Sequence, residues 1–127
     1  MTAKVLICDD SKMARKQMAR ALPADWPVDV HFAQDGQEAI DLIKAQSFDV
    51  LFLDLTMPVL DGYATLEIIR QEDLPIMVLV VSGDIQPEAQ ERVKKLGAID
   101  FIKKPVDAEQ IKQVLIEYGI LRDQAHE

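Results

Sequence analysis

Four charged side chains follow short apolar runs, and they are the residues best placed to do chemistry. The runs cover residues 4–8, 50–53 and 99–102, and the side chains after them are Asp9, Asp10, Asp54 and Lys104. Carboxylates that meet at the ends of buried strands repel one another unless a cation or a proton intervenes. A hard divalent cation and a phosphoryl group are the natural occupants of such a site.

Phosphoryl transfer to a carboxylate is the chemistry that these residues predict. Asp54 would be the nucleophile that attacks phosphorus and forms an acyl phosphate. Asp9 and Asp10 would hold Mg²⁺ (or Mn²⁺), directly or through water, because a magnesium site takes one or two carboxylates, waters and phosphate oxygens. Asp54 itself and the backbone carbonyl of Thr56 would complete the ligands that the protein supplies.

Positive charge and hydrogen-bond donors must also face the phosphoryl oxygens. We expect Lys104 to supply the charge, because Pro105 follows it and fixes the turn that aims it. Lys103 should alternate to the other side of its strand and be solvated. Ser82 ends another apolar run, where its hydroxyl would donate to the phosphoryl group, together with the backbone N–H of Gly83.

Length and composition favour one globular domain. The chain has 127 residues, of which 49% are hydrophobic and 28% charged, values that are ordinary for a globular protein. The formal net charge of −8 argues against a nucleic-acid surface, which needs a basic face. The single Cys8 lies in an apolar run and is expected to be a small buried hydrophobe. No apolar stretch approaches a membrane span or a signal peptide, so a reducing, cytoplasmic location is expected.

Short apolar runs alternate with helical patterns along the chain. Strands are expected at residues 4–8, 28–32, 50–53, 76–81 and 99–102. Helices are expected at residues 11–22, 35–46, from 61 to before Pro75, 87–96 and 107–118. The buried helix positions are expected to be Met13 or Ala14, then Met18, Ala21, Leu22, Ala39, Ile40, Ile43, Leu66, Ile69, Ala89, Val93, Leu96, Ile111, Val114, Leu115 and Tyr118.

Residues typical of helix ends support these bounds. The expected N-caps are Asp10 or Ser11, then Asp35, Asp61 and Asp107. Pro87 suits the first turn of a helix, and Gly97 suits the position just after one. Glu38 and Gln110 stand three residues after their caps, as in a capping box.

Five strands alternating with five helices predict an α/β fold, a three-layer (βα)₅ sandwich around a parallel, doubly wound sheet. The runs that end at Cys8, Leu53 and Val81 are apolar throughout, so these strands should be central. Val28, Val30 and Phe32 alternate with polar residues, so their strand should be an edge. The flavodoxin-like order 2-1-3-4-5 satisfies both demands, and it places the carboxyl ends of strands 1 and 3 at the ligand-binding switch point.

The whole pattern resembles the receiver domain of two-component response regulators, of the chemotaxis-regulator type found in bacterial signalling. Five features carry the resemblance in the right order along residues 5–118, and none is specific alone. They are Asp9-Asp10, Asp54, Met57-Pro58 with Asp61-Gly62, Ser82-Gly83 and Lys104-Pro105. The resemblance implies that a histidine kinase or phosphotransfer domain donates its phosphoryl group to Asp54. It also implies a cis peptide bond between Lys104 and Pro105.

The same resemblance implies a switch. Ser82 would be drawn toward the phosphoryl group, Phe101 would turn inward, and the surface of helix 4, strand 5 and helix 5 would change. Ser82 replaces a commoner threonine and Phe101 a frequent tyrosine, which leaves the strength of this coupling open. Thr56 and Asp84 flank the path of a hydrolytic water, so they should tune the lifetime of the phosphate. The domain would catalyse its own phosphorylation and dephosphorylation without being an enzyme.

Domain limits and partners follow from the same reading. Residues 1–120 would form the receiver domain and 121–127 a polar tail or the start of a linker. The output would be a downstream protein or a fused domain, and the chain would be a monomer or a phosphorylation-dependent dimer. Direct contact with nucleic acid or a membrane is not expected.

Three other functions remain alternatives. A haloacid-dehalogenase-type phosphatase also places a nucleophilic Asp after an apolar strand, but it needs a second Asp where this chain has Thr56. A nucleotide-binding module would need a glycine-rich loop after the first strand. A pseudo-receiver would bind partners without phosphorylation, which the intact acidic set and Lys104 oppose.

Overall fold

The computed structural model describes residues 2–83 and 86–121. Strands and helices alternate without exception along these residues. The strands are β1 (Ala3–Cys8), β2 (Val28–Ala33), β3 (Val50–Leu53), β4 (Met77–Ser82) and β5 (Asp100–Lys103). The helices are α1 (Lys12–Ala21), α2 (Gly36–Ala45), α3 (Gly62–Gln71), α4 (Pro87–Lys95) and α5 (Ala108–Glu117).

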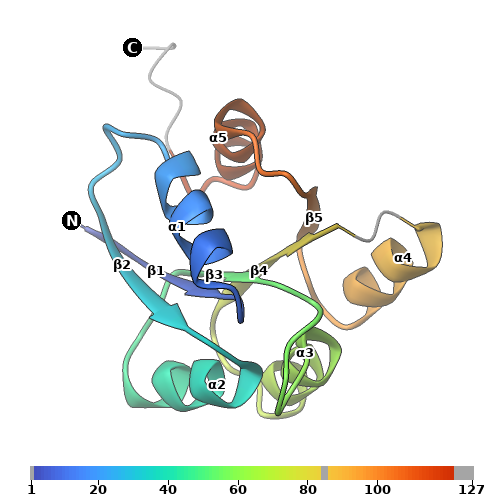
Figure 1. Cartoon of the computed structure of the whole chain (residues 1–127). Coiled ribbons are helices and arrows are strands. Elements are labelled where there is room, and N and C mark those ends of the chain that lie inside the picture. The colour runs from blue at the N-terminus through green and yellow to red at the C-terminus, as the bar shows by residue number, and fades with distance from the viewer. Residues whose placement is uncertain (1, 84–85, 122–127) are drawn as a thin grey trace.

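One parallel five-stranded sheet forms the centre of the protein, in the order β2-β1-β3-β4-β5. Helices α1 and α5 cover one face, and α2, α3 and α4 cover the other (Figure 1). The predicted fold class and strand order are therefore confirmed. The three central strands are the three apolar runs, because only strands that are covered on both faces need apolar residues throughout.

Two apolar clusters fill the spaces between the layers. Residues of β1 alternate between them: Leu6 and Cys8 belong to the cluster under α2, α3 and α4, whereas Val5 and Ile7 belong to the cluster under α1 and α5. This alternation follows from the period of two in a strand. All four side chains are at most 2% exposed, so the strand that carries Asp9 is fixed on both faces.

Local capping defines where the helices begin. Ser11, rather than Asp10, caps α1, and its side chain accepts from the backbone N–H of Ala14. Asp35, Asp61 and Asp107 cap α2, α3 and α5 as predicted. The cap of α5 accepts from the N–H of Glu109. Gly97 and Gly119 follow α4 and α5 with φ of 105° and 74°, a conformation that glycine adopts without a steric penalty.

Of the helix positions predicted to be buried, Tyr118 is exposed, Ala14 and Leu96 are half-buried, and Met13, the alternative to Ala14, is exposed. Tyr118 is 37% exposed because its hydroxyl donates to the Asp100 carboxylate at the edge of the sheet, 2.9 Å away. Phe32 shares the face of Val28 and Val30 but is 44% exposed. It borders a hollow beside the basic first turns of α1 instead of packing beneath the helix.

The end of the described chain packs on the domain. Ile120 and Leu121 lie against the cluster under α1 and α5, and both of their N–H groups donate to the carbonyl of Leu115. These two residues are therefore not part of a solvated tail. The division of the chain at residue 120 stays a prediction, because residues 122–127, including His126, lie outside the described residues.

Candidate functional site

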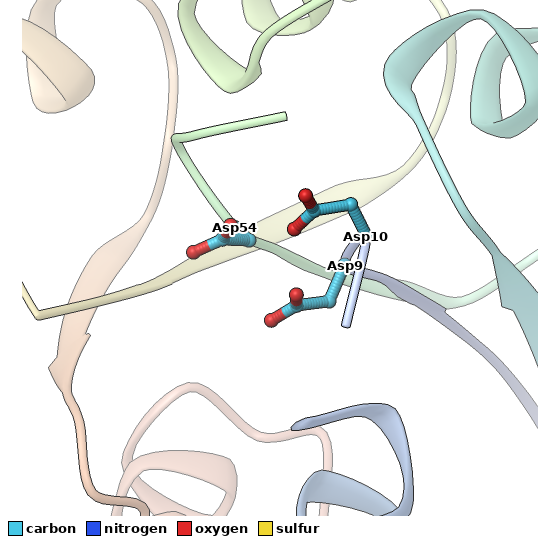
Figure 2. Close-up of side chains that lie close together, drawn as sticks. All are labelled: Asp9, Asp10 and Asp54. Atoms are coloured by element: carbon cyan, nitrogen blue, oxygen red, sulfur yellow. The ribbon is translucent and has the colours of Figure 1, made fainter. Parts of the chain in front are cut away.

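Three carboxylates converge at the carboxyl ends of β1 and β3 (Figure 2). Asp9, Asp10 and Asp54 each offer one oxygen, and these atoms lie within 4.8 Å of one another. Asp9 and Asp54 are buried, whereas Asp10 is exposed. The register that pairs Cys8 with Leu53 brings the first and third acids side by side. The acids that the sequence placed at one mouth of the sheet are therefore brought together, with an all-oxygen donor set of the kind that Mg²⁺ prefers.

Lys104 lies between the two buried carboxylates. Its Nζ is 2.9 Å from Asp9 Oδ2 and 3.1 Å from Asp54 Oδ1. Its backbone N–H donates to the carbonyl of Ser82 at 2.9 Å, which ties the lysine to the end of β4. The Lys104–Pro105 peptide bond is cis, as the resemblance implied. Lys103 is exposed, as expected.

The charges in this cluster only partly compensate one another. Burial raises the pKa of the Asp54 carboxyl and the charge of Asp9 raises it further, while the charge and hydrogen bond of Lys104 lower it without reversing the shift. For Lys104, burial is the largest single influence and lowers the pKa. The hydrogen bond to Asp9 and the charges of Asp54 and Asp9 together outweigh it, so the pKa is raised. Burial and the charge of Asp9 thus outweigh the stabilisation that Lys104 gives to the ionised Asp54 carboxylate.

Two hydrogen bonds from the start of α1 hold Asp9 in place. The N–H of Ser11 donates to Asp9 Oδ1 at 2.9 Å, and the guanidinium of Arg15 donates to the Asp9 carbonyl at 2.8 Å. Arg15 was not among the site residues predicted from the sequence. Helical side chains point back toward the helix N-terminus, so a long side chain one turn after the Ser11 cap was a usable indication.

The other predicted residues lie around the mouth. Ser82 is buried at the end of β4, and Gly83 after it is exposed. Thr56 is exposed, two residues after Asp54. Phe101 is half-buried and packs against the cluster under α2, α3 and α4. Their predicted roles stay predictions, and Asp84 lies outside the described residues.

Cys8 is an inert neighbour of the site. It is 1% exposed, and its Sγ contacts the Asp35 carbonyl at 3.2 Å and the Met57 sulfur at 3.4 Å. Burial, followed by the nearby carboxylates, raises the pKa of its thiol. A neutral buried thiol is a poor nucleophile, which confirms that Cys8 behaves as a small hydrophobe.

A cavity of about 330 Å³ opens beside the carboxylates. Asp54 and Lys104 line its polar end. Its apolar part is lined by Met18 of α1, Phe52 of β3 and Val106 of the β5–α5 connection. The phosphoacceptor candidate is therefore reachable from outside through a mouth whose wall is partly made by α1.

Comparison with known proteins places this geometry in a family. Residues 5–116 match the family described as the response regulator receiver domain. The chain belongs to this family. Among solved structures, the receiver domain of the putative response regulator NarL from Mycobacterium tuberculosis is 31% identical, with a TM-score of 0.85. The match covers 95% of this chain and 98% of that one.

A second solved receiver structure was determined with ligands. The CheX–CheY–BeF₃–Mg²⁺ complex from Borrelia burgdorferi contains a chain that is 29% identical to this one, with a TM-score of 0.85. The match covers 94% of this chain and 90% of that one.

Curated relatives are longer than this receiver domain. A protein-glutamate methylesterase/protein-glutamine glutaminase of Halalkalibacterium halodurans is 36% identical over 90% of this chain but over 35% of its own length. Response regulator MprA of Mycolicibacterium vanbaalenii is 38% identical over 87% of this chain and 48% of its own length. The chain thus spans less than half of the length of these relatives. Within the described residues, each helix is too short or too polar to span a bilayer.

Proposed function

We propose that Asp54 accepts a phosphoryl group from the phosphohistidine of a histidine kinase or phosphotransfer domain. The observation that carries this proposal is the placement of Lys104 Nζ between the buried carboxylates of Asp9 and Asp54. Asp54 stands at the end of a strand, with the Lys104 ammonium at hydrogen-bond distance and two further carboxylates beside it. A nucleophilic carboxylate, a cation and a group of acids that can hold a metal ion are the components of a site that accepts a phosphoryl group. The step forms a bond from Asp54 Oδ to phosphorus. The bond from phosphorus to the donor imidazole nitrogen breaks, and the imidazole keeps the electron pair and takes up a proton.

The three acids fit a magnesium ion. Asp9, Asp10 and Asp54 would hold it, with the backbone carbonyl of Thr56, because their oxygens already lie within 4.8 Å of one another. A bound Mg²⁺ supplies the positive charge that a carboxylate and a phosphoryl group need in order to approach. The raised pKa of Asp54, caused by burial and then by the charge of Asp9, supports this role for a cation, because Lys104 alone does not offset the two effects. The Borrelia burgdorferi CheY complex with BeF₃ and Mg²⁺ supports this reading, since BeF₃ resembles a phosphoryl group in size and charge.

Lys104 would move from its carboxylate partners to the phosphoryl oxygens, and Ser82 would donate to the same group. Phosphorylation adds about −1.5 to −2 charges. Near-complete switching between two states needs about 5.5 kcal/mol of differential stabilisation. Charge-assisted hydrogen bonds from Lys104 and Ser82 supply energies of that order. Phe101 would then turn inward, and the surface formed by α4, β5 and α5 would change for a downstream protein or a fused output domain.

Mass analysis tests the proposal directly. The wild-type chain is incubated with Mg²⁺ and acetyl phosphate, and intact-protein masses are compared with those of Asp54→Asn. We expect one acid-stable, base-labile phosphoryl group on the wild-type chain and none on the variant. Asp25→Asn is the matched control, because Asp25 is an exposed aspartate in the α1–β2 connection, and it should be labelled like the wild type.

Two outcomes would overturn the proposal. Steady release of phosphate without a labelled protein would favour the phosphatase alternative. Labelling of Asp54→Asn at the wild-type level would show that another residue is the acceptor. Omitting Mg²⁺ and adding EDTA should abolish labelling, because the uncompensated charge around Asp54 then opposes the anionic donor.

A further inference from the structure

The cavity beside the carboxylates has an apolar floor for which the transfer step itself has no need. Phe52 of β3 stands two residues before Asp54, so the period of two in a strand turns both side chains to the same face of the sheet. Ile7 of β1 stands in the same relation to Asp9, and Val81 of β4 completes the floor. The three apolar side chains belong to the cluster under α1 and α5 and are at most 5% exposed. The space next to Asp54 is therefore bounded by side chains that packing holds in place.

Helix α1 and the β5–α5 connection supply the walls of this cavity. Ala14 and Met18 stand four residues apart and so lie on one side of α1. Met18 is buried, whereas Ala14 is half-buried. Val106, also half-buried, forms the wall on the side of the β5–α5 connection. The short side chain of Ala14 leaves room that a longer one at this position would take.

The size of the cavity fits a small molecule. Its volume is about 330 Å³, at the lower end of the range of about 300–1,000 Å³ for small-ligand pockets. An apolar cavity of about 150 Å³ is large enough to hold benzene. The space therefore accommodates a phosphoryl group at Asp54 together with an apolar group of a few carbon atoms.

We propose that the apolar part of this cavity binds the acyl group of a small acyl phosphate, with a preference for acyl groups of about four to seven carbon atoms over acetyl. The inference rests on the proposed function of Asp54. In an in-line displacement the leaving group lies on the side of phosphorus opposite to the nucleophile. Asp54 stands at the polar end of the cavity and Met18 lines its apolar part, so a leaving group that points away from Asp54 enters the apolar space.

The reaction balances with this class of donor. The bond from Asp54 Oδ to phosphorus forms while the bond from phosphorus to the acyl oxygen breaks. The released carboxylate keeps the electron pair and takes no proton. One acyl phosphate is consumed and another is formed, so the two sides are similar in energy. A phosphate monoester would have to release an alkoxide, which is a much poorer leaving group.

The polar end of the cavity also favours a phosphorylated ligand over a free carboxylic acid. Asp9 and Asp54 repel a free carboxylate, whereas a phosphoryl group meets the Lys104 ammonium. Gln17 lies exposed at the rim, and its side chain has no hydrogen-bond partner among residues 2–83 and 86–121. Its amide can donate to the carboxylate that the transfer releases.

Two donors that differ only in the acyl chain test the proposal. The wild-type chain is labelled with acetyl phosphate or butyryl phosphate in saturating Mg²⁺, and intact mass gives the two second-order rates. Acetate and butyrate are almost equally basic leaving groups, so the ratio of the rates reports the contribution of two methylene groups. We expect butyryl phosphate to react about tenfold faster, because each buried methylene contributes about fourfold. A ratio near one would overturn the proposal.

Filling the cavity tests where the acyl chain binds. Ala14→Leu should reduce the ratio of butyryl to acetyl rates to about threefold or less, because the added carbons take the space of the chain. Ala19→Leu is the matched control, since Ala19 is another half-buried alanine of α1 but does not line the cavity. It should keep the wild-type ratio. The same ratio in both variants would show that the chain does not enter this cavity.

Direct binding decides the question even if Ala14→Leu does not fold. Butylphosphonate carries an apolar chain but cannot transfer its phosphoryl group. With Mg²⁺ it should shift the methyl NMR signal of Met18 and leave that of Met13, which is 69% exposed on the same helix and outside the cavity. An unshifted Met18 signal would overturn the proposal.

Failure of this proposal and failure of the phosphoacceptor function give different results. If acetyl phosphate does not label the wild-type chain, the proposed function of Asp54 is wrong. If acetyl phosphate labels Asp54 while butyryl phosphate has no advantage, only the acyl-binding role of the cavity is wrong.

Discussion

A β-carbon on Gly62 would stand 2.4 Å from the carbonyl oxygen of Asp54. It would also stand 2.7 Å from Cα of Leu55, so both close contacts are backbone atoms that cannot rotate away. The N–H of Gly62 donates to the Leu55 carbonyl at 3.0 Å. The first residue of α3 therefore fixes the backbone that carries the phosphoacceptor candidate.

Gly62→Ala should lower the free energy of unfolding by about 1–3 kcal/mol, the usual cost of overpacking. Alanine is the better helix former by about 1 kcal/mol, so a loss cannot come from helix propensity. Acetyl phosphate labelling should also slow, because Asp54 is displaced with its backbone. Urea unfolding and intact mass measure the two effects.

Gly83→Ala is the matched control, since a β-carbon there meets nothing within 4 Å among the described residues and its φ is not in the positive region. It should unfold at the wild-type urea concentration. Equal stability of the two variants would show that the backbone around Asp54 yields easily, and the positioning role of Gly62 would then be wrong.

Lys104 stabilises the Mg²⁺-free protein by pairing with Asp9 and Asp54, and it competes with Mg²⁺ for the same carboxylate oxygens. Its removal tests the two effects separately. Lys104→Gln should destabilise the Mg²⁺-free protein by about 1–2 kcal/mol. Loss of one partner of a buried pair costs about 3–5 kcal/mol, and solvent reduces this because the lysine side chain is 32% exposed. Thermal unfolding in EDTA measures the loss.

Mg²⁺ should restore more stability to Lys104→Gln than to the wild type, because the ion no longer competes with the lysine for Asp9 and Asp54. At a concentration of 100 times Kd the gain is about 2.7 kcal/mol. Lys103→Gln is the control, since Lys103 is the exposed neighbour. If Mg²⁺ stabilises Lys104→Gln less than it stabilises Lys103→Gln, the Lys104 ammonium and Mg²⁺ do not compete for the oxygens of Asp9 and Asp54.

Much of this site was predictable because it depends on topology. Parallel strands bring their carboxyl ends to one edge, so apolar runs followed by Asp9, Asp54 and Lys104 predict convergence without any knowledge of side-chain contacts. The strand order followed from which runs were apolar on both faces. These arguments need only the period and composition of each segment.

Contacts between segments that are distant in the sequence could not be predicted. The close approach of Gly62 to Asp54 is set by how α3 packs on β3, and a glycine at a helix start has other common explanations. Tyr118 looked like a core residue of α5, and only the placement of Asp100 on β5 shows where its hydroxyl goes. The exposure of Phe32 depends on where α1 begins over the sheet.

The raised pKa of Asp54 predicts how stability depends on pH. Burial and the charge of Asp9 raise this pKa above its ordinary value of 3.8, so ionised Asp54 opposes folding. Its contribution to stability is fully present below pH 3.8 and is lost as the pH rises through the raised folded-state pKa. At neutral pH without Mg²⁺, Asp54→Asn should therefore be more stable than the wild type.

The difference in melting temperature between Asp54→Asn and the wild type should shrink as the pH falls toward the unfolded-state pKa, where both side chains are neutral. Calorimetry at several pH values in EDTA measures it. Asp25→Asn should show no such dependence, which controls for a general loss of charge. A wild-type protein that is more stable than Asp54→Asn at neutral pH would show that Lys104 fully compensates the two acids.

Tyr118 offers a test at the surface where the switch is proposed. Its hydroxyl donates to Asp100 Oδ2 at 2.9 Å and joins the end of α5 to β5. This hydrogen bond, followed by slight burial and the charge of Asp100, raises the pKa of Tyr118. Asp100→Asn should lower that pKa toward its ordinary value, because the acceptor is then neutral. Ring signals of Tyr118 in an NMR titration measure the change.

Phosphorylation of Asp54 should shift the same ring signals if the surface of α4, β5 and α5 responds to it, since β5 carries both Asp100 and Phe101. BeF₃ with Mg²⁺ provides a stable substitute for the labile phosphate. Asp54→Asn under the same conditions is the control and should keep the unshifted signals. Full occupancy of Asp54 with no shift at Tyr118 would mean that the bond from α5 to β5 is the same in both states, so the response would have to be carried by α4 alone.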